Sequence, residues 1–147
     1  LENLKTIAEI LISDKKIRNE KIDSMIAKFE LDSVKDVKAS YLSGGQKKKL
    51  VIALALLSDP KVLLLDEPFA ALDVMTIKML QKIIVELQSE GNISIILCDH
   101  QARDLLTCVD LAIVLSNCKI VASGSPSELI NNTEAKSAYF GESFKLG

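Results

Sequence analysis

The feature that most constrains the fold is a short, continuous apolar run at residues 62–65, which ends directly at two carboxylates and a proline. Such a run is typical of a strand that is buried on both faces of a parallel sheet. A second apolar run covers residues 93–98. Between the two runs, an amphipathic helix is expected from about 73 to 90, with Gly91 as a left-handed cap. Strands that alternate with helices predict an α/β domain with crossover connections.

The stretch before these runs has a helical pattern instead. Apolar residues recur at helical spacing through residues 1–31, where Ser13 and Asp14 divide two predicted helices. A polar connection follows, and then a long helix that stops before Pro60, because the residue before a proline avoids the helical region. After the second strand we expect a short helix at 102–108, strands at 111–115 and 119–123, and a helix start at 125–128.

Composition excludes several classes of protein. The 147 residues are about one domain in length, and 18 basic against 20 acidic residues give a net charge of −2. This balance argues against a generic nucleic-acid or anionic-membrane surface. No apolar run approaches the roughly 18 residues of a membrane-spanning helix, and the first residues lack the pattern of a signal peptide. The chain has no initiator methionine, and we expect that it begins within a longer protein.

The cysteines favour neither a disulfide framework nor a zinc site. Cys98, Cys108 and Cys118 are odd in number and show no C-x-x-C spacing. Each lies in or beside an apolar stretch, so we predict buried thiols that act as small apolar side chains in a reducing compartment.

A serine, two glycines and a glutamine open the long helix at Ser43, Gly44, Gly45 and Gln46. Ser43 and Gln46 have the spacing of a capping box, which by itself accounts for these two residues. The glycines need another reason, because each costs up to about 1 kcal/mol relative to alanine in a helix. They leave backbone N–H groups bare at the positive end of a helix, and such an end binds phosphate.

Two adjacent carboxylates, Asp66 and Glu67, end the first apolar run. The carboxyl edge of a parallel sheet is where ligands bind, although a loop of solvated acids is the simpler alternative. We predict that Asp66 lies near a Mg²⁺ ion and that Glu67 positions an attacking water. Pro68 is expected to restrict Glu67 to an extended backbone.

Two further polar residues stand at the boundaries of predicted elements. Asp73 can cap the following helix, and this role alone would explain it. His100 is the only histidine and follows a strand directly, in phase with the carboxylates after the other strand. A lone histidine is usually structural, but this position favours contact with a γ-phosphate.

Taken in this order, the four motifs resemble the nucleotide-binding domains of ABC ATPases. Residues 42–46 are similar to the signature motif, 62–67 to the Walker B strand with its catalytic glutamate, and 70–73 to the D-loop, while His100 is similar to the switch histidine. The resemblance implies a P-loop NTPase fold with a mostly parallel sheet. It also implies ATP and Mg²⁺ as ligands.

The resemblance also implies how the chain is divided into subdomains and which partners it binds. Residues 1–58 would be part of a helical subdomain that ends in the signature helix, and 59–147 would be the C-terminal part of the RecA-like core with its tail. Two such subunits pair head to tail around two ATP molecules and bind transmembrane permease subunits. No nucleic acid is expected as a partner.

Within the family, the aromatic and acidic tail at residues 138–147 is similar to that of ATPases that power lipopolysaccharide export. This implies a peripheral subunit on the cytoplasmic side of a bacterial inner membrane. Branched-chain amino-acid importers share part of the pattern and remain an alternative. A soluble ABC-type ATPase of translation or DNA repair is a second alternative, and an inactive fragment is a third alternative.

One expected motif is missing. The sequence contains no G-x-x-x-x-G-K-[ST], and the lysines at 47–49 follow the signature residues instead of standing in a P-loop. We interpret these lysines as a solvated basic face. Because a P-loop positions and neutralises the phosphates, we expect the 147-residue chain alone to show no ATPase activity.

Overall fold

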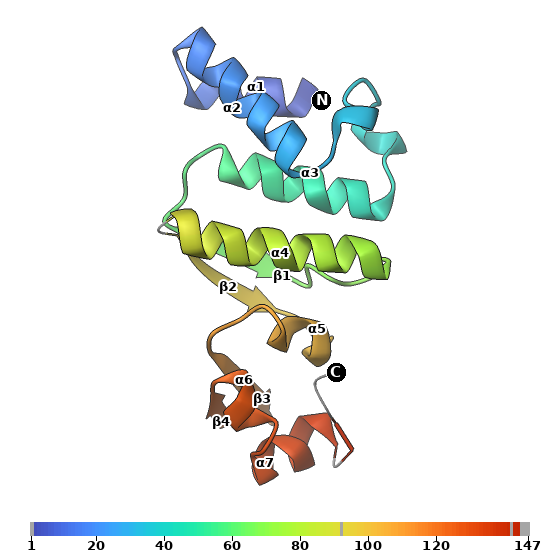
Figure 1. Ribbon diagram of the computed structural model, residues 1–147, viewed down its shortest axis with the longest axis vertical. Helices are drawn as coiled ribbons and strands as arrows, with labels where there is room; N and C mark the ends of the chain where they lie inside the picture. The colour runs from blue at the N-terminus through green and yellow to red at the C-terminus, as the bar shows by residue number, and fades with distance from the viewer. Residues whose placement is uncertain (1, 92, 142, 145–147) are drawn as a thin grey trace.

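The computed structural model describes residues 2–91, 93–141 and 143–144. In Figure 1 the elements follow one another along the long axis of the molecule, from the helices at the N-terminus to a hairpin and short helices near the C-terminus. The α-helices are α1 (Glu2–Leu11), α2 (Lys15–Lys28), α3 (Gly44–Leu56), α4 (Val74–Gly91), α5 (Ala102–Leu106), α6 (Pro126–Leu129) and α7 (Thr133–Ala135), and a π-helical turn, Lys136–Phe140, follows α7. The strands are β1 (Val62–Asp66), β2 (Ser94–Cys98), β3 (Ala112–Ser116) and β4 (Lys119–Gly124).

The helical first part has the predicted division. Asp14 caps α2 by accepting hydrogen bonds from the backbone N–H groups of Lys16 and Ile17 at 2.8 and 3.0 Å. The polar connection that follows contains two short 3₁₀ turns, Asp32–Val34 and Ala39–Tyr41. These turns bring the chain back so that α3 can pack against α1.

The strands form two separate pairs. β1 and β2 are parallel, in a register that places Val62 opposite Ser94 and Asp66 opposite Cys98. β3 and β4 form an antiparallel hairpin, so parallel pairing does not extend to them among the described residues. The two residues between these strands, Asn117 and Cys118, have φ values of +48° and +58°. Left-handed residues at both positions suit a tight hairpin turn, which brings the two strands together directly.

Only one face of the parallel pair is covered, which corrects the expectation of strands buried on both faces. Leu63 is 5% exposed and joins the main core, whereas its neighbour Leu64 is 70% exposed. Ile96 on β2 is exposed as well. Successive side chains point to opposite faces of a strand, and here α3 and α4 supply apolar contacts to one face.

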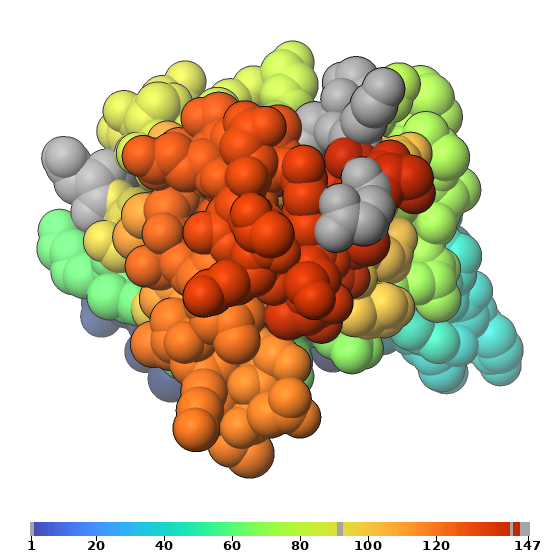
Figure 2. All heavy atoms as spheres, turned by 90° about the horizontal axis from the view of Figure 1, so that it is seen from below, coloured from blue at the N-terminus to red at the C-terminus, as the bar shows by residue number. Residues whose placement is uncertain are grey.

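Two clusters of buried side chains hold the chain together. The larger one contains residues of α1 to α4 and the buried face of the parallel strands, with Phe29, Phe69 and Leu80 fully buried in it. The smaller one lies around Val114 and Leu129 and joins the hairpin to the C-terminal helices. Figure 2, seen from the C-terminal end, shows the orange and red segments gathered over this face of the molecule.

Several local expectations need correction. Only Cys108 is buried, while Cys98 and Cys118 are exposed. Gly91 is the last residue of α4 itself, not a residue beyond it. α3 ends at Leu56 rather than just before Pro60: Leu57 is its C-cap, and Asp59, with a φ of +48°, lies outside the right-handed helical region.

Candidate active site

The chain turns sharply where β1 ends. Glu67 has a φ of +47°, so its backbone is left-handed and not extended as predicted. The residue before a proline is excluded from the right-handed helical region by steric clash, and the left-handed region is the other way to turn. Two hydrogen bonds hold this conformation: the Glu67 N–H donates to the Cys98 carbonyl at 2.7 Å, and the Ala70 N–H donates to the Glu67 carbonyl at 3.3 Å.

The turn brings Glu67 to the histidine that follows the other strand. His100 Nδ1 lies 3.5 Å from Glu67 Oε1, and both side chains are more than half exposed, at 65% and 59%. The parallel register explains this proximity, because Asp66 and Cys98 are partners at the carboxyl ends of β1 and β2. In this arrangement, which is open to solvent, the carboxylate can orient a water, and an imidazole N–H can donate a hydrogen bond to an anion at the same place.

Asp99 is a further site residue, which the sequence analysis did not single out. Its side chain is 0% exposed and links the two loops. Oδ2 accepts from the Phe69 N–H at 3.0 Å, and Oδ1 accepts from the Gln101 N–H at 2.9 Å. The bond to Gln101, two residues on, is a local pattern that aspartate often makes, and it could have marked this residue in the sequence.

One lysine, Lys48, and one tyrosine, Tyr139, each donate a hydrogen bond to one of these two loops. The Lys48 ammonium donates to the Glu67 carbonyl, and Lys49 Nζ lies 3.4 Å from Glu30 Oε2. The interpretation of residues 47–49 as a solvated face is therefore wrong for two of the three lysines. On the other side, the Tyr139 hydroxyl donates to the His100 carbonyl at 3.1 Å.

The start of α3 contains the predicted capping box. Ser43 Oγ accepts from the Gln46 N–H at 3.2 Å, and Gln46 Oε1 accepts from the Ser43 N–H at 2.9 Å. The glycines differ: a Cβ on Gly45 would lie 3.4 Å from Thr76 Cγ2, whereas a Cβ on Gly44 would meet nothing within 4 Å. Gly45 therefore faces Thr76 of α4 at ordinary contact distance, and Gly44 faces open space.

Asp73 caps α4, as its position indicated. Its carboxylate accepts from the Thr76 N–H at 3.0 Å and from the Thr76 hydroxyl at 2.6 Å. The hydroxyl bond, together with the N–H bond, lowers the pKa of Asp73 below its ordinary value of 3.8. A groove of about 360 Å³ joins Asp73 and Thr76 to residues 43–46 at the start of α3.

The predicted residues therefore form two groups. Glu67, His100 and Asp66 lie at the carboxyl end of the parallel strands, and residues 43–46 share a groove with Asp73. Each group has a component suited to an anion: a histidine in the first and the N-terminus of a long helix in the second.

Asp66 is suited to a magnesium ion. It is exposed at the end of β1, and its carboxylate makes no hydrogen bond or ion pair with any residue that the structure describes. The described residues contain no cluster of three or more histidine, cysteine or acidic ligands. Mg²⁺ does not need one, because it is commonly bound by one or two carboxylates together with waters and substrate phosphates.

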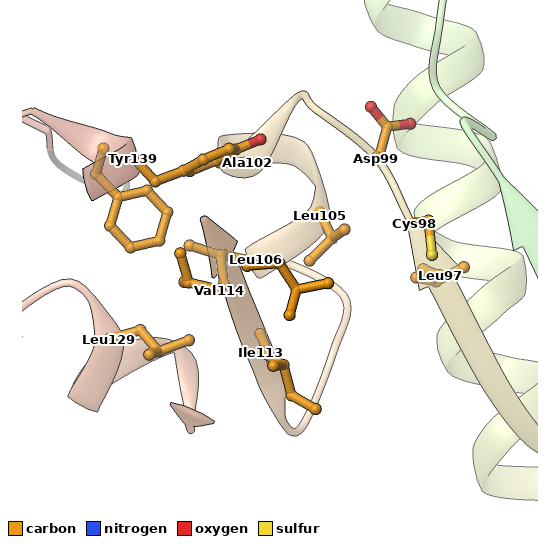
Figure 3. Close-up of a pocket in the computed structure, with 13 residues that line it drawn as sticks. Leu97, Cys98, Asp99, Ala102, Leu105, Leu106, Ile113, Val114, Leu129 and Tyr139 are labelled. Atoms are coloured by element: carbon orange, nitrogen blue, oxygen red, sulfur yellow. The ribbon is translucent and has the colours of Figure 1, made fainter. Parts of the chain in front are cut away.

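Neither of the two groups of predicted site residues lines the apolar cavity of about 220 Å³ between β2 and β3. Figure 3 shows Leu97 and Cys98 on one side of it and Ile113, Val114 and Leu129 on another. β2 and β3 are not hydrogen-bonded to each other, so the cavity lies between two strand pairs. Burial first, and then the charges of Asp104 and Asp99, raise the pKa of the nearby Cys108 thiol to about 12, so this cysteine is no nucleophile near neutral pH.

Comparison with known proteins shows which family this chain resembles. Residues 1–70 match the family described as ABC transporter. The lipopolysaccharide export system ATP-binding protein LptB of Haemophilus influenzae is 36% identical over 146 residues, which are 99% of this chain and 60% of that protein. The protein of the same name from Escherichia coli K12 is 32% identical over 129 residues, which are 88% of this chain and 53% of that protein.

Solved structures of ABC transporter components are also similar to this chain. cbiO1 from Clostridium perfringens, part of the ABC transporter complex cbiONQ, is 31% identical with a TM-score of 0.73, over 84% of this chain and 49% of that chain. The ADP conformation of MJ1267, an ATP-binding cassette of an ABC transporter, is 27% identical with a TM-score of 0.74, over 88% and 52%. The predicted α/β fold of the P-loop NTPase class is thereby confirmed. The chain spans about half to 60% of the length of these relatives.

Among the described residues, no helix combines the length and the apolar character that crossing a membrane requires.

Proposed function

We propose that the chain, which is similar to ATP-binding proteins of ABC transporters, forms part of an ATPase that powers transport across a membrane. The observation that carries this proposal is the pairing of Glu67 with His100, 3.5 Å apart at the carboxyl end of the parallel strands. Beside them stands Asp66, an exposed carboxylate with no partner among the described residues. Such a set can serve the transfer of a phosphoryl group to water.

The proposed mechanism gives each residue of this first group one task. The Glu67 carboxylate orients the attacking water and accepts its proton. The His100 imidazole donates a hydrogen bond to the γ-phosphate of ATP. Asp66 would hold Mg²⁺, which neutralises charge on the phosphates when bound.

The second group acts on a nucleotide held by another subunit. Ser43 and Gln46 bond to each other, so the phosphate meets the backbone N–H groups of Gly44 and Gly45 at the positive end of α3. Asp73 shares the groove with these residues and would face the same interface. Two subunits that pair head to tail would therefore each complete the site of the other.

For the transported substrate we propose lipopolysaccharide. The support is that the relatives from Haemophilus influenzae and Escherichia coli, at 36% and 32% identity, carry the name of a lipopolysaccharide export system. The subunit would then bind permease subunits from the cytoplasmic side of a bacterial inner membrane. Its near-balanced charge, −2 over the chain, favours no nucleic-acid partner.

Replacing Glu67 by glutamine in the full-length native protein tests the site. Glu67→Gln should keep ATP binding, because shape is conserved, while hydrolysis falls by about 10²–10⁴-fold with the loss of the base. Retained ATP should hold two subunits together as a dimer in gel filtration, and Ser43→Arg should prevent this dimer by crowding the start of α3. The control is Glu9→Gln, an exposed glutamate on α1. Hydrolysis at the normal rate by Glu67→Gln would mean that the site is misassigned.

The transported substrate has its own test. In vesicles that contain the protein with its permease subunits, lipopolysaccharide should raise ATP hydrolysis and branched-chain amino acids should not. Stimulation by the amino acids alone would favour the importer alternative and leave the ATPase assignment intact.

A further inference from the structure

The Glu67 carbonyl receives two hydrogen bonds, one of them from a different element. The Ala70 N–H, three residues on, donates to it at 3.3 Å, and the Lys48 ammonium reaches it from α3. Lys48 lies four residues after Gly44, the first residue of that helix, and is half-buried. A single side chain therefore connects the start of α3 with the turn that carries Glu67.

This carbonyl controls where the Glu67 carboxylate points. Glu67 has a φ of +47°, a conformation that residues with a Cβ rarely adopt, so contacts around it must hold it there. Pro68 follows and has no N–H that could take part in holding the turn. A hydrogen bond to the carbonyl between these residues limits rotation of the peptide unit and, with it, the direction of the Glu67 side chain.

The neighbouring lysines show that the contact is specific to one position. Lys47 is exposed, and its side chain makes no hydrogen bond or ion pair within the described residues. The Lys49 side chain instead lies 3.4 Å from Glu30, which follows the end of α2. Successive residues of a helix point in different directions, so only the middle lysine reaches the turn after β1.

We propose that Lys48 is a positioning residue for Glu67, which ties the position of the signature end of α3 to water activation at the end of β1. The proposal rests on the proposed function, because it assumes that Glu67 acts in hydrolysis. The helix whose start would bind the nucleotide, at residues 43–46, is also the helix that carries Lys48. Contact at the interface between subunits would then be communicated to the catalytic carboxylate of the same chain.

The test compares three lysine variants of the full-length native protein. Lys48→Met removes the donor and keeps the length of the side chain, Lys48→Arg keeps a donor, and Lys47→Met is the matched control one residue away. We expect Lys48→Met to lower kcat about tenfold while KM changes less than about twofold, because the contact serves the catalytic step and not ATP binding. Lys48→Arg should recover most of the rate, and Lys47→Met should equal the wild type.

A double variant separates positioning from a general structural role. If Lys48 acts through Glu67, then Glu67→Gln combined with Lys48→Met should hydrolyse ATP no more slowly than Glu67→Gln alone. Additive losses, a rise in KM, or an equal effect of Lys47→Met would overturn the proposal. If Lys48→Met does not fold, Lys48→Leu, which also lacks a donor, replaces it in the same cycle. Failure of the proposed function itself would look different, because Glu67→Gln alone would then leave hydrolysis unchanged.

Discussion

The start of α3 and the turn after β1 are both built from polar groups, but they are held in different ways. At the start of α3, Ser43 and Gln46 bond to each other across three residues. At the turn after β1, the bond from Ala70 to Glu67 is local, but others come from far along the chain: Lys48 lies 19 residues from Glu67, and Asp99 lies 30 residues from Phe69. The first structure is complete in itself, whereas the second exists only when α3 and both loops are in place.

This difference determines how far damage should spread. A change in the capping box removes bonds within one turn of one helix. A change at a residue that joins two loops releases both of them, because the bonds it made were the link between distant segments. Comparing substitutions in the two regions therefore tests whether the acidic turn really depends on the rest of the fold.

The largest effect is expected at Asp99. Asp99→Ala leaves the N–H groups of Phe69 and Gln101 without their acceptor in a part-buried place. Each such loss costs about 1–3 kcal/mol, so we expect a fall of several degrees in the melting temperature. Amide exchange should accelerate at Phe69 as well as at Gln101, which lie in different loops.

The matched control is Asp110→Ala, since Asp110 is exposed and its side chain makes no hydrogen bond or ion pair within the described residues. Circular dichroism melts of the two variants give the comparison. Equal melting temperatures for Asp99→Ala and Asp110→Ala would show that the loops are held by something other than Asp99.

The same difference explains what the sequence could predict. The capping box at Ser43 and the cap at Asp73 are local patterns, and both are present in the structure. The strands of the parallel pair and the helices around them were also predicted, because apolar periodicity is a local property. The left-handed backbone of Glu67 was not predicted, since two of the three bonds that hold it come from residues distant in sequence, Cys98 and Lys48.

The open face of the parallel pair was missed for a related reason. A continuous apolar run predicts that both faces prefer burial, and it says nothing of whether the covering elements are present. Leu64 satisfies the pattern in sequence and is nevertheless 70% exposed. The hairpin was missed because Asn117 and Cys118 are not the glycine-containing pair that usually marks a tight turn.

A smaller and more local effect is expected at Ser43. Ser43→Ala removes the acceptor of the Gln46 N–H, and loss of such a cap typically costs about 1 kcal/mol. Amide exchange should accelerate at Gln46 and its neighbours and remain unchanged at Phe69. Ser33→Ala, at an exposed serine, serves as control. Faster exchange at Phe69 in Ser43→Ala would break the distinction between the two regions.

The smallest effect concerns the pKa of Asp73, which tests the local character of the α4 cap. The Thr76 hydroxyl and N–H both donate to the carboxylate and lower its pKa below 3.8. Thr76→Val removes only the hydroxyl, so the pKa of Asp73 should rise toward the ordinary value without reaching it. A carboxyl with a lowered folded pKa stabilises the fold above its unfolded pKa, and this contribution disappears as the pH falls through the folded value. The stability difference between wild type and Thr76→Val should therefore be full at pH 5–7 and shrink below about pH 4.

Carbon-detected NMR titration of the carboxyl groups measures the shift, with Asp110 in the same spectra as an internal reference. Because Asp73 is open to solvent, the change should be small and confined to this cap. An unchanged Asp73 titration in Thr76→Val would mean that the hydroxyl bond does not set this pKa, and a shift at Glu67 or His100 would mean that the two groups of residues are coupled within one chain.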